Sequence, residues 1–115
     1  PDHFAGWSGS DDKVGMTTAL ESMAKLPNAH LRYSSTSLGP YADLNDAEKN
    51  LFRRVIEAFT PQRMMWGSNF PSSRDGGYVG QVKLGQTALP WLPAEDREWI
   101  MGKSAHKLWP MLQAA

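Results

Sequence analysis

The chain has 115 residues with twelve basic and twelve acidic side chains, so it carries no net charge that would favour nucleic acid or an anionic membrane as a partner. It contains no cysteine, which excludes disulfides, thiolate catalysis and cysteine-ligated metals and fits a cytoplasmic protein. No apolar run approaches the roughly 18 residues of a membrane span, while five tryptophans and six methionines indicate a packed core.

The first half of the chain predicts two strands separated by a helix. Residues 1–7 are typical of a strand that ends in a loop, and the polar residues 8–12 indicate a turn and a helix start. A helix is expected from Val14 to Leu26 and a short strand from Ala29 to Ser34, followed by a loop over residues 35–41. The expected apolar face of the helix comprises Met16, Ala19, Leu20, Met23, Ala24 and Leu26.

The second half predicts a further helix, a strand and a helical end. Asn45 and Glu48 stand three residues apart as a capping box, so a helix is expected to begin at Asn45 and to end at Thr60-Pro61. Its expected buried face comprises Ala47, Leu51, Phe52, Val55, Ile56 and Phe59. Residues 64–67 predict a short buried strand and 68–77 a loop. Helices are then expected over 78–89, over 94–101 with an end at Gly102, and over 104–109.

This alternation of strands and helices is typical of right-handed βαβ crossovers and a parallel sheet. The sequence therefore predicts one α/β domain over residues 1–115. Three parallel strands would leave unpaired backbone groups at both edges, and three helices barely cover one face of such a sheet. We expect either that further strands precede Pro1 or that copies of the chain complete the sheet as a homo-oligomer, and we favour the first.

Four motifs follow one another along the chain. The longest is residues 59–71, Phe-Thr-Pro-Gln-Arg-Met-Met-Trp-Gly-Ser-Asn-Phe-Pro. The others are residues 2–6 (Asp-His-Phe-Ala-Gly), 26–34 (Leu-Pro-Asn-Ala-His-Leu-Arg-Tyr-Ser) and 100–109 (Ile-Met-Gly-Lys-Ser-Ala-His-Lys-Leu-Trp). In this order they resemble motifs of the amidohydrolase-related family, whose last strand runs from Phe-Gly-Pro-x-Arg into Gly-Ser-Asp-Trp-Pro or Ala-Ser-Asn-Phe-Pro.

The resemblance implies that the chain forms the C-terminal three β-α units of a TIM (β/α)8 barrel, with chemistry at the carboxyl ends of the strands. It also implies hydrolysis of a small cyclic ester or amide, or in some members decarboxylation. Some members bind a divalent metal through a His-x-His pair on the first strand, whereas others, including dicarboxylate lactonases, use none. We predict no cofactor from this segment and leave a divalent metal open for a complete enzyme.

His3 and Asn69 are the two candidate catalytic residues. His3 follows a predicted strand, where an imidazole could polarise a substrate carbonyl or steady an oxyanion. Asn69 stands where many relatives hold an aspartate, and because an amide cannot accept a proton, we expect it to orient substrate or water. The simpler interpretation of His3 is a histidine near the chain end without a partner. The simpler interpretation of Asn69 is a turn residue whose side chain hydrogen-bonds the neighbouring backbone.

Ser34, Ser35 and Arg74 are the candidate substrate-binding residues. The two serines follow a predicted strand and could bind substrate oxygens, while Arg74 could hold a substrate carboxylate in bidentate fashion. A plain polar loop and a solvated arginine explain the same residues more simply. His30 and His106 are interpreted as structural, since neither forms a metal-ligand spacing with another His, Asp or Glu.

The sequence thus predicts a hydrolase of a lactone or amide that binds a small-molecule substrate when its barrel is complete and is inactive as this segment alone. The alternative is a non-catalytic half-barrel that folds by self-association or with a partner segment. A flavodoxin-like binding module is a third interpretation, for which Ser8-Gly9-Ser10 would be a poor phosphate-binding loop.

Overall fold

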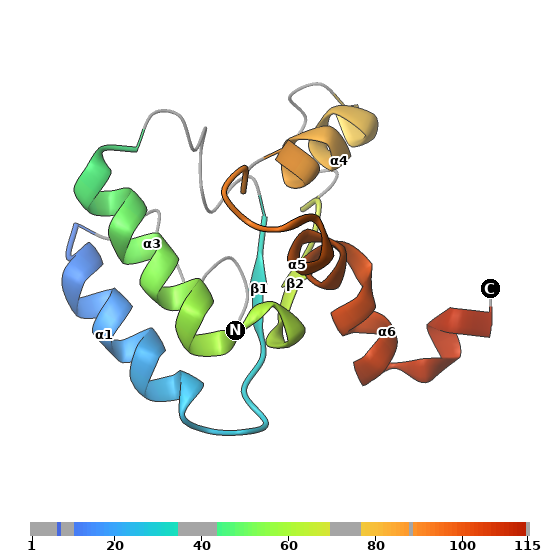
Figure 1. Ribbon diagram of the computed structural model, residues 1–115, viewed down its shortest axis with the longest axis horizontal. Helices are drawn as coiled ribbons and strands as arrows, with labels where there is room; N and C mark the ends of the chain where they lie inside the picture. Colours follow the sequence, from blue (N-terminus) through green and yellow to red (C-terminus); the bar gives the residue numbers. More distant parts are fainter. Residues whose placement is uncertain (1–6, 8–10, 35–43, 70–76, 88, 115) are drawn as a thin grey trace.

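The computed structural model describes Trp7 and residues 11–34, 44–69, 77–87 and 89–114. The strand expected over residues 1–7 lies outside the described residues except for Trp7. Figure 1 shows helices α1 and α3 side by side, the two strands next to them, and α5 and α6 beyond β2. No helix in these ranges is long and apolar enough to cross a membrane.

Helix α1 spans Lys13–Ala24, and Asp12 caps its first turn by accepting a hydrogen bond from the backbone N–H of Gly15 at 2.8 Å. The prediction of its apolar face was wrong at Ala19 and Leu26, which are exposed. Leu26 lies beyond the end of the helix, and the buried row passes through Thr17 instead of Ala19. The buried side chains of α1 are Thr17, Leu20 and Ala24.

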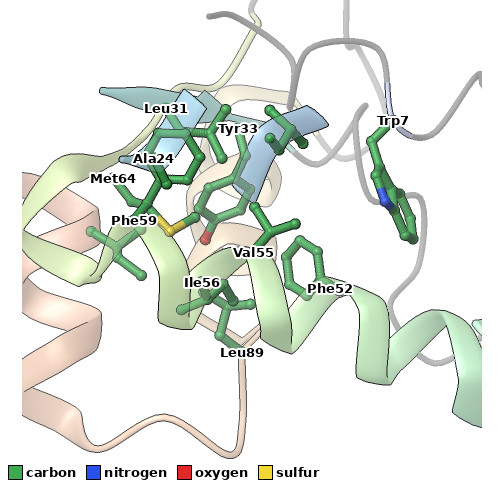
Figure 2. Close-up of a cluster of buried hydrophobic side chains, with 12 residues drawn as sticks. Trp7, Ala24, Leu31, Tyr33, Phe52, Val55, Ile56, Phe59, Met64 and Leu89 are labelled. Atoms are coloured by element: carbon green, nitrogen blue, oxygen red, sulfur yellow. The ribbon is translucent and has the colours of Figure 1, made fainter. Parts of the chain in front are cut away.

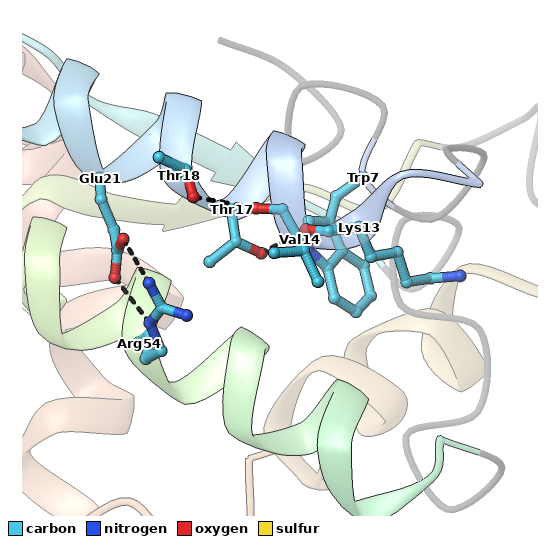
Figure 3. Close-up of polar contacts among 7 residues, drawn as sticks. All are labelled: Trp7, Lys13, Val14, Thr17, Thr18, Glu21 and Arg54. Atoms are coloured by element: carbon cyan, nitrogen blue, oxygen red, sulfur yellow. Dashed lines mark hydrogen bonds and ion pairs between the residues drawn. The ribbon is translucent and has the colours of Figure 1, made fainter.

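Trp7 is fixed against α1 by a buried hydrogen-bond chain (Figure 3). Its indole Nε1–H donates to Thr17 Oγ1 at 3.0 Å, and the Thr17 hydroxyl donates to the Lys13 carbonyl at 2.6 Å. Its ring also lies 6.2 Å from that of Phe52 in α3, centroid to centroid. Because Thr17 both accepts and donates, a hydroxyl can occupy the buried face of α1 without an unsatisfied polar atom.

The two described strands, β1 (Leu31–Tyr33) and β2 (Met64–Trp66), pair in parallel with Leu31 opposite Met64 and Tyr33 opposite Trp66. The expected strands at 29–34 and 64–67 are confirmed in shorter form. Parallel pairing requires a crossover between the strands, and helix α3 supplies it. The described part of the chain is therefore an α/β arrangement, as predicted.

Helix α3 spans Asp46–Phe59, and the predicted capping box is present. The Glu48 N–H donates to Asn45 Oδ1 at 2.8 Å, and the Asn45 N–H donates to Glu48 Oε2 at 3.2 Å. Thr60 ends the helix with a φ of 67°. The expected buried face is confirmed at Phe52, Val55, Ile56 and Phe59, whereas Ala47 is exposed near the first turn.

The hydrophobic core lies between the strands and their helices (Figure 2). Leu31, Tyr33 and Met64 point from the strands toward side chains of α1 and α3. The core side chains from these helices are Leu20, Ala24, Phe52, Val55, Ile56 and Phe59, and Trp7, Leu89 and Ile100 complete the cluster. The strands therefore turn one face to the helices, and side chains at alternate positions lie on the opposite face.

Helix α4, Gly77–Thr87, packs on the indole of Trp66 through Gly85. A Cβ at Gly85 would lie 2.5 Å from Trp66 Nε1 and 2.7 Å from its Cε2, closer than real side-chain contacts allow. The absence of a side chain at Gly85 thus lets α4 approach the end of β2.

The C-terminal part is one nearly continuous helical run of α5 (Ala94–Glu98), η4 (Trp99–Lys103), α6 (Ser104–Leu108) and η5 (Pro110–Ala114). The predicted helix end at Gly102 was wrong. The Ser104 N–H donates to the carbonyl of Trp99, five residues back, so a π-type turn carries the chain through Gly102.

Candidate functional site

The carboxyl ends of β1 and β2 lie at the same edge of the sheet. The Gly67 N–H donates to the Tyr33 carbonyl at 2.9 Å, which continues the parallel pairing one residue beyond β2. Ser34 leaves β1 at this edge, and Ser68 and Asn69 leave β2 beside it. Parallel pairing therefore brings together the strand ends that carry two predicted site residues, Ser34 and Asn69. We call this end of the sheet the carboxyl edge.

Asn69 adopts a φ of 55°, in the left-handed region. Among residues with a Cβ, asparagine is one of those that adopt this conformation most readily, so the backbone fits the turn interpretation. The side chain is partly exposed. It can donate and accept hydrogen bonds toward a ligand at the carboxyl edge, but it cannot take a proton from water.

Ser34 is buried, at 2% exposure. Its hydroxyl is thus packed within the fold at the carboxyl edge, and solvent does not reach it directly. The remaining predicted site residues, His3, Ser35 and Arg74, lie outside the described residues, so their roles stay predictions.

The face of the sheet opposite the helices carries Arg32, a residue that the sequence interpretation passed over. Leu31 and Tyr33 on either side of it are buried in the core, whereas Arg32 is exposed. Met65 is its register partner on β2 and shares its face. The signal in the sequence was a charged residue between two core residues in a strand.

The amino ends of the strands are held together by Arg63, whose role the sequence interpretation also missed. All five of its N–H donors meet backbone carbonyls at 2.8–3.4 Å. The acceptors are the carbonyl oxygens of Ala24, Leu26, Ala29, Ala58 and Phe59. This explains an arginine four residues after Phe59, because its guanidinium satisfies carbonyls at the C-terminal ends of both α1 and α3.

In a hollow at this amino end, two of the lining residues, Arg63 and Ser104, already bond backbone carbonyls. The hollow is lined by Pro27, His30, Gln62, Arg63, Ser104, Lys107 and Leu108. The Arg63 donors are already bonded to carbonyls, and the Ser104 hydroxyl donates to the Pro61 carbonyl at 2.7 Å. His30 Nδ1 lies 3.1 Å from the Asn28 carbonyl and donates to it, in keeping with its structural interpretation.

The described residues do not assemble a metal-ligand set. No three His, Cys, Asp or Glu side chains come together within the described ranges. Asn69 would offer only a neutral amide oxygen at the carboxyl edge, where a carboxylate would be the stronger ligand for a divalent ion.

Tyr33 is the buried titratable residue of the described core, and it does not belong to the carboxyl edge. Burial raises the pKa of its phenol above the ordinary value. Its hydroxyl has no hydrogen-bond partner among the described residues, and its ring points into the core beside Val55 (Figure 2). The raised pKa reflects desolvation and indicates no catalytic acid.

Comparisons with known proteins agree with this geometry. The amidohydrolase family matches residues 2–111. D-galactarolactone isomerase from Agrobacterium fabrum is 37% identical over 65 residues, 54% of this chain and 20% of the isomerase. L-fucono-1,5-lactonase from Burkholderia ambifaria is 38% identical over 64 residues, 54% of this chain and 22% of the lactonase.

A crystal structure of an amidohydrolase from Burkholderia multivorans has a similar fold, with a TM-score of 0.66 at 22% identity. The structural match covers 93% of this chain and 42% of that protein. The sequence matches span only about a fifth of each curated relative. The resemblance expected from the four motifs is thus confirmed over nearly the whole sequence: the chain belongs to the amidohydrolase family.

Proposed function

We propose that these residues are the C-terminal three β-α units of a (β/α)8 barrel that hydrolyses a lactone. The observation that carries the proposal is the parallel pairing of β1 and β2, which brings their carboxyl ends together. In barrels of this kind the active site lies at that end of the strands. Both curated relatives are named for sugar lactones, which supports this substrate class over a linear amide.

The reaction adds the oxygen of water to the lactone carbonyl carbon and breaks the ring C–O bond, with a proton passing to the leaving oxygen. Asn69 positions the water or the carbonyl by hydrogen bonding, and His3 stabilises the oxyanion that forms. The proton lost by water must go to a group other than Asn69, because an amide is not a base at neutral pH. Ser35 and Arg74 are proposed substrate contacts, and Ser34 supports the edge from within the fold.

The test compares two proteins on a panel of sugar lactones. One is the 115-residue chain, and the other is the protein encoded by the reading frame that includes any sequence upstream of Pro1. We expect the longer protein to hydrolyse at least one lactone and the 115-residue chain to be inactive, because its strands alone do not close a barrel. Hydrolysis by the short chain would contradict the three-unit interpretation, and no hydrolysis by either would contradict the function.

A non-catalytic half-barrel that self-associates remains the second candidate, and exposed apolar side chains on the C-terminal helices favour it. These side chains are 40–69% exposed: Leu108, Trp109, Met111 and Leu112. Together they form an apolar surface that a second copy would cover. Sedimentation velocity decides the point, since a discrete dimer supports this candidate and a monomer at high concentration contradicts it.

A further inference from the structure

Thr60 has a backbone conformation that a residue with a side chain rarely adopts. It begins residues 60–63, which connect α3 to β2 and which we call the joint. Its φ is 67° and its ψ is 151°. This region is populated almost entirely by glycine, and a β-branched residue with a positive φ is a clear outlier. The Thr60 side chain is exposed, so little packing offsets the cost, and the joint is strained.

Hydrogen bonds hold the backbone on both sides of Thr60. Its N–H donates to the Ile56 carbonyl at 2.8 Å, and its carbonyl accepts from the Arg63 N–H at 3.0 Å. The carbonyls of Ala58 and Phe59, just before it, accept from the Arg63 guanidinium at 3.1 and 2.9 Å. A strained residue persists when its surroundings determine its conformation in this way.

A further hydrogen bond reaches the joint from the C-terminal helical run, residues 94–114, which we call the terminal run. The Ser104 hydroxyl donates to the Pro61 carbonyl at 2.7 Å, across 43 residues of sequence. Ser104 is 1% exposed and begins α6. Both η4 and α6 contact the joint and β2, and Ile100 of η4 enters the core. The terminal run is therefore docked on the joint through a polar contact and an apolar one.

We propose that docking of the terminal run keeps the joint in its strained conformation, and that the joint relaxes when the run undocks. Parts of a fold open locally at a lower free energy than global unfolding requires. Strain that is released on opening lowers the free energy of that opening, so Thr60 makes the terminal run easier to undock. The Met64 N–H donates to the same Pro61 carbonyl, so undocking also loosens the start of β2. The proposal does not depend on lactone hydrolysis.

Hydrogen exchange in the longer protein tests the proposal, measured by mass spectrometry on segments that cover the joint and α6. Thr60→Gly removes the Cβ and with it the strain. We expect amide exchange in α6 to slow by roughly three- to thirty-fold, because strain no longer favours undocking and the greater freedom of glycine in the open state offsets only part of this gain. An unchanged exchange rate in α6 would show that it opens without relaxing the joint and would overturn the proposal.

Two control variants isolate the contribution of the Cβ at Thr60. Thr60→Ala keeps a Cβ at the same φ and should slow exchange in α6 much less than Thr60→Gly. Thr18→Gly makes the glycine substitution at an exposed position within α1 and should not slow exchange in α6. Equal slowing in Thr60→Ala and Thr60→Gly would assign the effect to the rest of the side chain and would contradict the role of backbone strain.

Ser104→Ala tests the same coupling from the terminal run. Loss of the hydrogen bond to Pro61 should speed exchange in α6 and in the joint together, by a similar factor of roughly three- to tenfold. Ser22→Ala, at an exposed position on α1, is the matched control and should change neither rate. Faster exchange in α6 alone, or no change in either segment, would mean that the terminal run does not hold the joint.

Discussion

Arg63 donates hydrogen bonds to carbonyls at the ends of α1 and α3, at the amino end of the strands. Its contribution to the free energy of unfolding can be measured directly. Arg63→Lys keeps the charge but offers three donors in place of five, leaving at least two carbonyls unsatisfied. We expect the free energy of unfolding to fall by about 2–4 kcal/mol, measured by urea denaturation. Arg54→Lys is the matched control on α3, because the exposed Arg54 donates to the carboxylate of Glu21. An equal loss in both variants would contradict this role.

Tyr33 gives a prediction of opposite sign, because its hydroxyl is buried without a partner among the described residues. Tyr33→Phe removes that unsatisfied group, so the free energy of unfolding at neutral pH should stay unchanged or rise by up to about 1 kcal/mol. A loss above that size would show that the hydroxyl has a partner.

The pH dependence of the free energy of unfolding also tests the burial of Tyr33. The unfolded phenol loses its proton near its ordinary pKa of 10.0, whereas burial raises the pKa in the folded state. The unfolded chain therefore binds fewer protons above pH 10, and the free energy of unfolding falls there by up to about 1.4 kcal/mol per pH unit. Tyr33→Phe should remove this slope in denaturation measured between pH 9 and 11, and a slope that persists unchanged would refute it.

At the scale of elements, the contact of α4 with β2 depends on Gly85. Alanine there gains about 1 kcal/mol of helix propensity, but its Cβ would displace the Trp66 indole, at a cost of about 1–3 kcal/mol. We expect Gly85→Ala to lower the melting temperature and to change the fluorescence of Trp66. Gly102→Ala is the control, because a Cβ at Gly102 meets nothing within 4 Å. A melting temperature raised by both variants would show that α4 lies elsewhere.

The sequence pattern predicted those features of the fold that depend on neighbouring residues. The capping box at Asn45 and the termination at Thr60 depend on neighbouring residues alone, and both are present. The helix through Gly102 could not be foreseen, since a π-type bond replaces the expected C-cap. The position of Arg32 on the face opposite the helices and the role of Arg63 were also missed. They depend on which face of β1 the helices cover and on carbonyls as far as 39 residues away in sequence.

The candidate site was predictable in part for the same reason. Parallel strands follow from the alternation of elements, so Ser34 and Asn69 could be assigned to one edge before any coordinates. The burial of Ser34 depends on tertiary packing, which the pattern of serines in the loop does not reveal.

Across the described residues, the two ends of the strands carry different groups. The amino end carries Arg63 and Ser104, whose donors bind backbone carbonyls and hold the helices in place. The carboxyl edge carries Arg32, Gly67 and Asn69, with a partly exposed amide and an exposed guanidinium. In (β/α)8 enzymes the amino ends of the strands serve stability and the carboxyl ends carry the active site, and the proposed function assigns the same roles here.

The central claim is that the carboxyl edge is the site of lactone hydrolysis, and Asn69→Gly in the longer protein tests it most directly. Glycine keeps the left-handed backbone of Asn69 and removes the amide, so the fold should be retained. We predict that kcat for lactone hydrolysis falls roughly a hundredfold, while Asn50→Ala on the exposed face of α3 has no effect. Full activity in Asn69→Gly would show that Asn69 serves only the turn and would contradict the claim.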